Sequence, residues 1–137
     1  MSHIYRRSSQ DKEWQKVKSL VRERDNNRCR IIRCLTAQEV LILKKNAGYN
    51  LNIIDPAHYL SVSNRPDLCY DADNICCLNR YSHQNLDDFK SPIDGHNISE
   101  DEVNNWWIRI LSTNYKQLNS LREKGLLKEN QNAVSDN

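Results

Sequence analysis

The sequence predicts one α+β domain in which a short β-hairpin and the helix after it are flanked by N-terminal and C-terminal helices. Apolar residues repeat at helical spacing near both ends of the chain, from about residue 11 and again from about residue 99. Two apolar runs in the middle, 51–60 and 75–78, have the length of strands and are separated by a polar loop. A chain of 137 residues suits a single domain with a modest core.

The N-terminal third is predicted to contain a flexible basic arm and two helices. The arm covers residues 1–10, and the first helix covers about Asp11 to Arg24. Its apolar stripe consists of Trp14, Val17, Leu20 and Val21. Residues 29–34 are predicted to form a turn or a short strand pair. Thr36 and Glu39 then form a capping box that begins a second helix, which Gly48 is expected to end.

The middle of the chain is predicted to form the hairpin. Residues 51–60 alternate imperfectly and indicate a strand broken at Pro56, whereas 61–73 is rich in Ser, Asn, Pro and Asp and indicates a loop. The second strand covers about 75–78. Asn79 can cap a helix that continues through Asp87 and Phe89.

The C-terminal third is predicted to be one long amphipathic helix followed by a tail. Ser99 and Glu102 form a second capping box. The apolar residues of this helix are Val103, Trp107, Ile110, Leu111, Tyr115 and Leu118. Residues 123–137 are polar and are predicted to be disordered. The domain is therefore expected to span 11–122, with its hairpin-and-helix core at about 51–89.

The distribution of charge and the composition limit the function classes. Residues 1–45 contain twelve Lys or Arg against five Asp or Glu, and residues 46–100 contain three against eight. This asymmetry favours a protein that holds an anionic backbone with one part and a cation with another, although a solvated charged helix is the simpler alternative. No run approaches the roughly 18 apolar residues of a membrane span, and the polar, basic N-terminus does not resemble a secretory signal. Five cysteines, an odd number, favour reduced thiols inside a cell.

Three residues in the centre have an order and spacing that match a known motif. His58 is followed sixteen residues later by Asn74 and nine residues after that by His83. This segment, 55–87, resembles the HNH, or ββα-metal, nucleases. The lead-in from Arg22 to Cys29 is similar to that of phage and bacterial HNH proteins, and the stretch 55–63, Asp-Pro-Ala-His-Tyr-Leu-Ser-Val-Ser, is similar to phage-encoded members that include the NinG/Rap type of recombination nuclease.

The resemblance implies a catalytic role for His58 and Asn74. A neutral imidazole can deprotonate water near pH 7, so His58 is the expected general base. Asn74 is expected to tie the loop together and orient His58, because an amide donates and accepts hydrogen bonds at once. His83 and Asp87 are four residues apart on one face of a helix and are the expected metal ligands.

The third metal ligand departs from the family pattern. The position before the base is Ala57, which cannot bind a metal, so Asp55 is expected to replace it, directly or through water. The carboxylates favour one Mg²⁺ or Mn²⁺ ion, with Zn²⁺ and Ni²⁺ as alternatives. We do not expect a structural zinc, because the positions of the usual second cysteine pair hold Asn79 and Ser82.

DNA is the expected partner. Arginines gather before the catalytic segment, and Arg80 begins the helix that carries His83. The arginines expected to bind substrate phosphates are Arg28, Arg30, Arg33 and Arg80. The expected function is a metal-dependent DNA endonuclease that nicks one strand per site, in a cytoplasmic monomer or weak homodimer of phage origin that contacts no membrane. Two alternatives are a nuclease selective for branched recombination intermediates and a non-catalytic DNA-binding or assembly module with a degenerate site.

Overall fold

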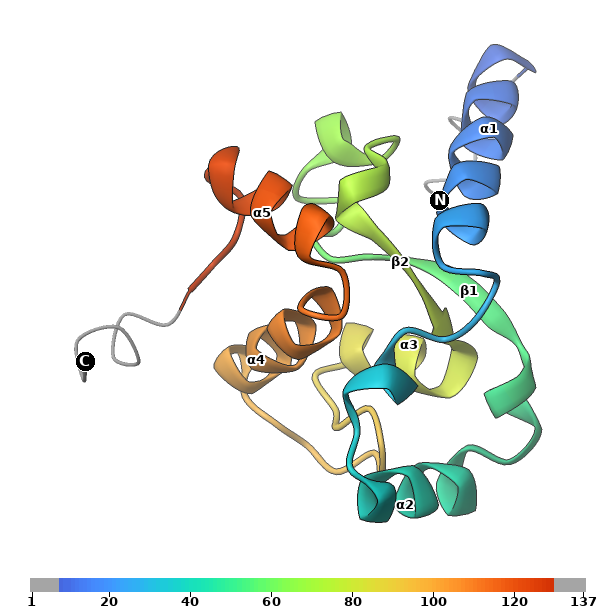
Figure 1. Cartoon of the computed structure of the whole chain (residues 1–137), viewed down its shortest axis with the longest axis vertical. Coiled ribbons are helices and arrows are strands. Elements are labelled where there is room, and N and C mark those ends of the chain that lie inside the picture. Colours follow the sequence, from blue (N-terminus) through green and yellow to red (C-terminus); the bar gives the residue numbers. More distant parts are fainter. Residues whose placement is uncertain (1–7, 130–137) are drawn as a thin grey trace.

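An antiparallel two-stranded hairpin lies at the centre of the chain, with helices on both sides (Figure 1). The computed structural model describes residues 8–129, and their side chains from residue 12 onward. The helices and strands are α1 (Ser8–Arg24), α2 (Ala37–Ala47), β1 (Ile54–His58), β2 (Ile75–Asn79), α3 (Arg80–Asp87), α4 (Glu100–Leu111) and α5 (Tyr115–Glu123). Short 3₁₀ helices lie at Ile31–Cys34, Gly48–Asn52, Pro66–Leu68 and Ala72–Asn74. The predicted α+β class is confirmed.

The hairpin pairs Ile54 with Asn79 at one end and His58 with Ile75 at the other. The predicted break at Pro56 was wrong, because Pro56 lies inside β1 opposite Cys77. Proline lacks a backbone N–H, but the Pro56–Cys77 pair needs none, because the backbone groups of Cys77 have partners outside β1. The Cys77 N–H donates to Asp25, and the Cys77 carbonyl accepts from the N–H of Arg30.

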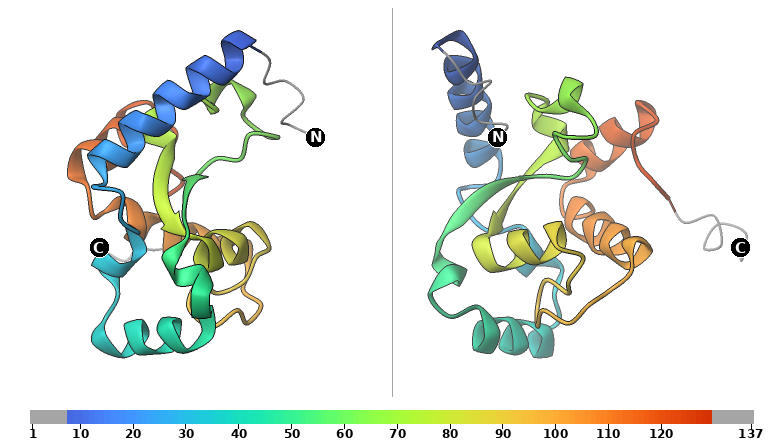
Figure 2. Two further views of the ribbon diagram at one scale, coloured as in Figure 1. Left: turned by 90° about the vertical axis from the view of Figure 1, so that its right-hand side faces the viewer. Right: turned by 180° about the vertical axis from the view of Figure 1, so that it is seen from behind.

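Alternate residues of β2 face two different hydrophobic clusters. Ile75 and Cys77 pack with Trp14, Val17 and Val21 of α1. On the opposite face, a larger cluster joins the hairpin to α2, α3, α4 and α5 and includes Cys76, Leu78, Leu43, Leu86, Trp107, Ile110 and Leu121. Figure 2 shows the hairpin between α1 on one side and α4 and α5 on the other. The period of two along β2 therefore fills both faces of a two-stranded sheet.

The helix ends follow their capping residues. Both predicted capping boxes are present, at Thr36 with Glu39 and at Ser99 with Glu102. The prediction of a single long C-terminal helix was wrong, because α4 ends at Leu111 and α5 begins at Tyr115. Asn114 caps α5 by accepting a hydrogen bond from the N–H of Gln117. A local cap therefore overrides the continuous apolar periodicity.

Several predicted boundaries shift in the structure. Residues 8–10 of the predicted arm belong to α1, and residues 1–7 lie outside the described residues. The segment 29–34 contains a 3₁₀ helix and not a strand pair. Helix α3 ends at Asp87, before Phe89, whose φ of 57° is incompatible with a right-handed helix.

The predicted disordered tail was wrong for residues 123–129. Glu123 ends α5, and Leu126 and Leu127 pack against the larger cluster. The hydroxyl oxygen of Tyr59 accepts a hydrogen bond from the N–H of Lys128. Residues 130–137 lie outside the described residues.

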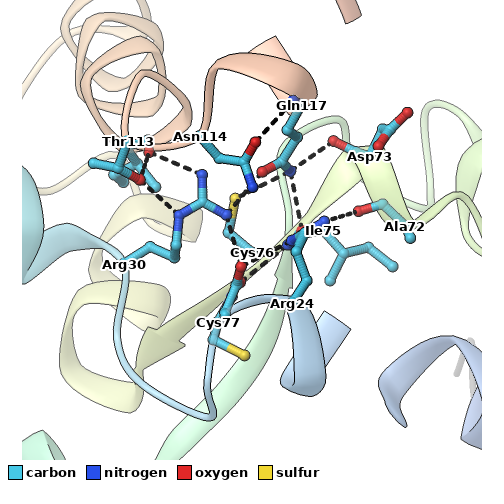
Figure 3. A network of polar contacts seen from close by, with 12 residues as sticks. Arg24, Arg30, Ala72, Asp73, Ile75, Cys76, Cys77, Thr113, Asn114 and Gln117 are labelled. Atoms are coloured by element: carbon cyan, nitrogen blue, oxygen red, sulfur yellow. Dashed lines mark hydrogen bonds and ion pairs between the residues drawn. The ribbon is translucent and has the colours of Figure 1, made fainter. Parts of the chain in front are cut away.

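A buried polar network joins the end of α1 and the segment after it to β2 and α5 (Figure 3). Asp25 and Arg30 are both fully buried and form an ion pair at 3.0 Å. Arg30 also donates to the amide oxygen of Gln117, and Arg24 donates to both oxygens of Asp25. The amide nitrogen of Gln117 donates to the carbonyl of Ile75. The network therefore links elements that are far apart in the sequence.

Candidate active site

His58 is the last residue of β1, and its ring is held on two sides. Its imidazole stacks on the indole of Trp14 with the ring centroids 5.5 Å apart and an interplanar angle of 17°. Its Nε2 atom lies 3.0 Å from the carbonyl oxygen of Cys69. A carbonyl oxygen can only accept a hydrogen bond, so Nε2 carries the proton of the neutral ring. This arrangement suits a general base.

Asn74 is fully buried and ties the loop after β1 to the start of β2. Its amide oxygen accepts from the N–H of Leu60 at 2.8 Å, and its amide nitrogen donates to the Leu60 carbonyl at 2.9 Å and toward that of Leu68 at 3.4 Å. Its own carbonyl accepts from the N–H of Tyr59 at 2.8 Å. These contacts tie the two residues after His58 to the residue before β2, and the orienting role of Asn74 stays a prediction.

His83 lies on α3 between two carboxylates. Its Nδ1 is 3.0 Å from an oxygen of Asp55, and its Nε2 is 3.3 Å from an oxygen of Asp87. Arg80 donates to both oxygens of Asp55, at 3.0 and 3.2 Å. Partial burial would raise the pKa of Asp55, but the hydrogen bonds from Arg80 and His83 outweigh it and hold that pKa below its usual value. Asp55 is therefore an ionised acceptor.

Asp87 connects the surroundings of the two histidines. It lines one cavity, of about 550 Å³, together with His58, and a second, of about 570 Å³, together with His83. The pKa of Asp87 is raised because nearby protein atoms reduce the hydration of its carboxyl and because Asp88 lies beside it. Since 63% of the side chain is exposed, this rise is limited.

A divalent cation fits between His83 and Asp87. Two neighbouring ligands that each bind one ion at about 2.1 Å are separated by about 3.0 to 3.4 Å, for octahedral to tetrahedral angles. The 3.3 Å between Nε2 of His83 and the Asp87 oxygen lies in that range. Among residues 12–129, no three His, Cys, Asp or Glu side chains are grouped to hold one ion. His83 and Asp87 are therefore a pair of groups at the separation that two ligands of one ion would have.

Asp55 and Asp87 contact different nitrogens of His83. Both oxygens of Asp55 accept from Arg80 or His83. The replacement of a ligand at Ala57 by Asp55 therefore stays a prediction, and the contact that the structure shows is the one between Asp55 and His83. An acceptor at Nδ1 keeps the proton on that atom and directs the Nε2 lone pair toward Asp87.

The predicted arginines separate into three kinds. Arg80 lies beside His83 and lines the same cavity. Arg30 was wrongly predicted to bind substrate, because it is fully buried and satisfied by Asp25, Thr113 and Gln117. Arg28 and Arg33 are exposed on the turn after α1 but line neither of the two described cavities.

Sequence reasoning missed two contacts of His58. Trp14 was predicted as a core residue of the first helix, which is correct, yet the same ring also supports the imidazole. The Cys69 carbonyl belongs to a loop whose path no local pattern predicts. Helical spacing correctly indicated that Trp14, Val17 and Val21 are buried, whereas Leu20 of the predicted stripe is exposed. Nothing in the sequence indicated that His58 would contact the buried face of α1.

The chain was compared with family models, curated proteins and solved structures, and no family model, curated protein or solved structure matches it. No helix within residues 8–129 is long and apolar enough to cross a membrane. The geometry of the site is therefore the basis for assigning a function.

Proposed function

We propose that this chain is a metal-dependent DNA endonuclease of the HNH, or ββα-metal, class. Support comes from the placement of three residues in the order strand end, turn and helix. His58 ends β1, Asn74 precedes β2, and His83 lies on α3 directly after it. This is the arrangement that the sequence resemblance implies for a general base, an orienting amide and a metal ligand.

The two contacts of His83 carry the proposal. A neutral imidazole has one N–H. The ionised carboxylate of Asp55 accepts a hydrogen bond from it when the proton is on Nδ1. The Nε2 lone pair then faces the Asp87 carboxylate at 3.3 Å, an unfavourable contact unless positive charge lies there. Either a second proton on the ring or a cation bound by both groups supplies that charge. A hard ion such as Mg²⁺ binds through few protein ligands and keeps waters and substrate phosphates, which suits this pair.

The chain's own residues then divide the work of phosphodiester hydrolysis. His58 takes a proton from water while the water oxygen bonds to phosphorus and the bond to the 3′ oxygen breaks, and the leaving oxygen takes a proton from solvent. When bound, a divalent cation supplies positive charge that offsets the charge on the leaving oxygen. Asp55 fixes the orientation of His83, and Asn74 and Trp14 fix the position of His58. The products are a 5′-phosphate and a 3′-hydroxyl.

The test is cleavage of supercoiled plasmid and of a four-way DNA junction, in Mg²⁺, Mn²⁺ or EDTA. We expect metal-dependent nicking by the wild type and a loss of roughly 10²- to 10⁴-fold in His58→Ala, the usual contribution of a general base. Asp55→Asn should require roughly 10- to 100-fold more metal for half-maximal nicking, as expected for a residue that orients a ligand.

His96→Ala is the matched control, because His96 is exposed and pairs with Asp94 away from both cavities. It should cleave as the wild type does. Cleavage by His58→Ala at the wild-type rate would overturn the assignment of the base. Absence of cleavage of either substrate in either metal would overturn the proposed function.

A further inference from the structure

One face of α1 forms a wall of the cavity that contains His83. Trp14, Lys18 and Arg22 are spaced by four residues, so they lie in one row along the helix. Arg80 and His83 of α3 line the same cavity. We call this cavity the α1 groove. Asp55 and Pro56 of β1 line it as well, together with Gln84 and Asp87 of α3.

The cations of the row are not neutralised by acids. Within residues 12–129, neither Lys18 nor Arg22 has a carboxylate partner within 4.0 Å, whereas Arg24, Arg30, Arg65, Arg109, Arg122 and Lys124 each have one. The ammonium of Lys18 lies 5.7 Å from the centre of the Trp14 ring. Arg22 contacts two oxygens, the side-chain oxygen of Asn27 at 3.0 Å and the Ile54 carbonyl at 3.5 Å. Both positive charges therefore face the α1 groove without an internal counter-ion.

We propose that the α1 groove binds the sugar-phosphate backbone of a nucleic acid next to the cleaved bond, with Lys18 and Arg22 each contacting a phosphate. This rests on the proposed function, since it places the substrate beside His83. The groove holds Lys18, Arg22 and Arg80 against Asp55 and Asp87, and Asp55 is already paired with Arg80 and His83. A row of cations along a helix suits the regular spacing of backbone phosphates, and carries no information about base sequence.

In this proposal Lys18 and Arg22 make the main contacts with nucleic acid, and the arginines of the turn after α1 do not. Arg30 of that turn is buried, and Arg28 and Arg33 line neither cavity. The other cavity next to His58 is lined by Glu100, Asp101 and Glu129 against Arg65 and Lys128, so it repels a polyanion more than the α1 groove does. A strand that reaches His83 is therefore guided along α1 by Lys18 and Arg22.

The test measures DNA binding without cleavage. The wild type and Lys18→Gln/Arg22→Gln are titrated into a fluorescein-labelled 20-base-pair duplex in EDTA, at salt concentrations from 20 to 300 mM, with fluorescence anisotropy as the readout. Each phosphate contact contributes about 0.9 to the slope of log K against log salt. We expect the double variant to lower that slope by about 2 and to bind roughly 10- to 60-fold more weakly at 0.1 M salt.

Two further variants make the result specific. Lys44→Gln/Lys45→Gln removes the same charge from the exposed last turn of α2, outside both cavities, and should keep the slope within about 0.5 of the wild type. Lys18→Arg/Arg22→Lys keeps both charges and should restore binding. Equal losses in the α1 and α2 pairs, or an unchanged slope in the α1 pair, would overturn the α1 groove while plasmid nicking still tests the nuclease. Absence of duplex binding by the wild type at 20 mM salt would overturn the groove even if nicking is observed.

Discussion

Replacing Asp25 with alanine should cost more stability than any exposed acidic substitution in the chain. The Asp25 carboxylate accepts from Arg24 at 2.8 and 3.0 Å, from Arg30 at 3.0 Å and from the N–H of Cys77 at 3.0 Å. It is fully buried, as is Arg30. Removing it leaves the guanidinium of Arg30 in the interior without its counter-ion, which typically costs about 3–5 kcal/mol.

The loss should be visible in thermal unfolding. A domain of this size has an unfolding entropy near 0.26 kcal/mol/K, from about 2.1 cal/mol/K per residue, so each kcal/mol lowers Tm by about 4 °C. Asp25→Ala should therefore lower Tm by about 12–20 °C, measured by circular dichroism or calorimetry. Asp67→Ala is the matched control, because Asp67 pairs with Arg65 on the surface with 61% of its side chain exposed. That pair is worth at most about 1 kcal/mol.

The same carboxylate predicts a dependence of stability on pH. Burial would raise the pKa of Asp25, but the hydrogen bonds from Arg24 and Cys77 and the charge of Arg30 outweigh it, so the folded pKa lies below the usual value. The stabilisation is therefore complete above the unfolded pKa of about 3.9 and is lost as the pH falls through the folded pKa. Between pH 6 and 3, the wild type should lose more stability than Asp25→Ala. Equal Tm losses in Asp25→Ala and Asp67→Ala would refute this account of the network.

Two further predictions concern the loop after β1 and the buried thiols. Asn74→Ala should lower the free energy of unfolding by about 1–3 kcal/mol in urea titration, because the N–H and carbonyl of half-buried Leu60 lose their partner. Asn119→Ala, at an exposed position, is the control, and equal stability of the two variants would contradict a stabilising role of the Asn74 contacts. Burial raises the pKa of Cys77 to about 12, so at pH 8 its thiolate fraction is about 10⁻⁴, against about a quarter for a thiol of pKa 8.5. Mass spectrometry after iodoacetamide treatment of the native protein should find Cys69 labelled before Cys77, and early labelling of Cys77 would contradict the packing of β2.

Local signals predicted the elements whose boundaries depend on neighbouring residues. Both capping boxes, the Asn79 cap and the stop at Gly48 are contacts within a few residues, so the sequence contains them in full. The interruption before α5 also has a local cause, since Asn114 caps the start of α5. The apolar repeat through Tyr115 instead suggested one continuous helix. Tyr115 is 72% exposed, so it was never part of the buried stripe.

Contacts between distant residues limited what could be predicted about the site. The order and spacing of His58, Asn74 and His83 correctly indicated a strand end, a turn and a helix. Whether an arginine faces solvent or a buried acid depends on partners far along the chain. Arg30 meets Thr113 and Gln117, more than eighty residues away, and no local pattern contains that information. The contact between Asp55 and His83 likewise depends on where α3 packs against β1.

Helix α1 connects the buried polar network at Asp25, which stabilises the fold, with the Trp14 ring that stacks on His58. Asp25 directly follows α1 and is fixed to the backbone of β2, whereas Trp14 lies eleven residues earlier and supports His58 on β1. Eleven helical residues span about 16 Å, and a helix transmits a displacement over that length as a rigid body. A shift at Asp25 would therefore move the indole relative to His58, and would carry Lys18 and Arg22 with it. Anchoring the helix at one end with buried charge thus fixes both the stacked imidazole and the cationic wall of the α1 groove.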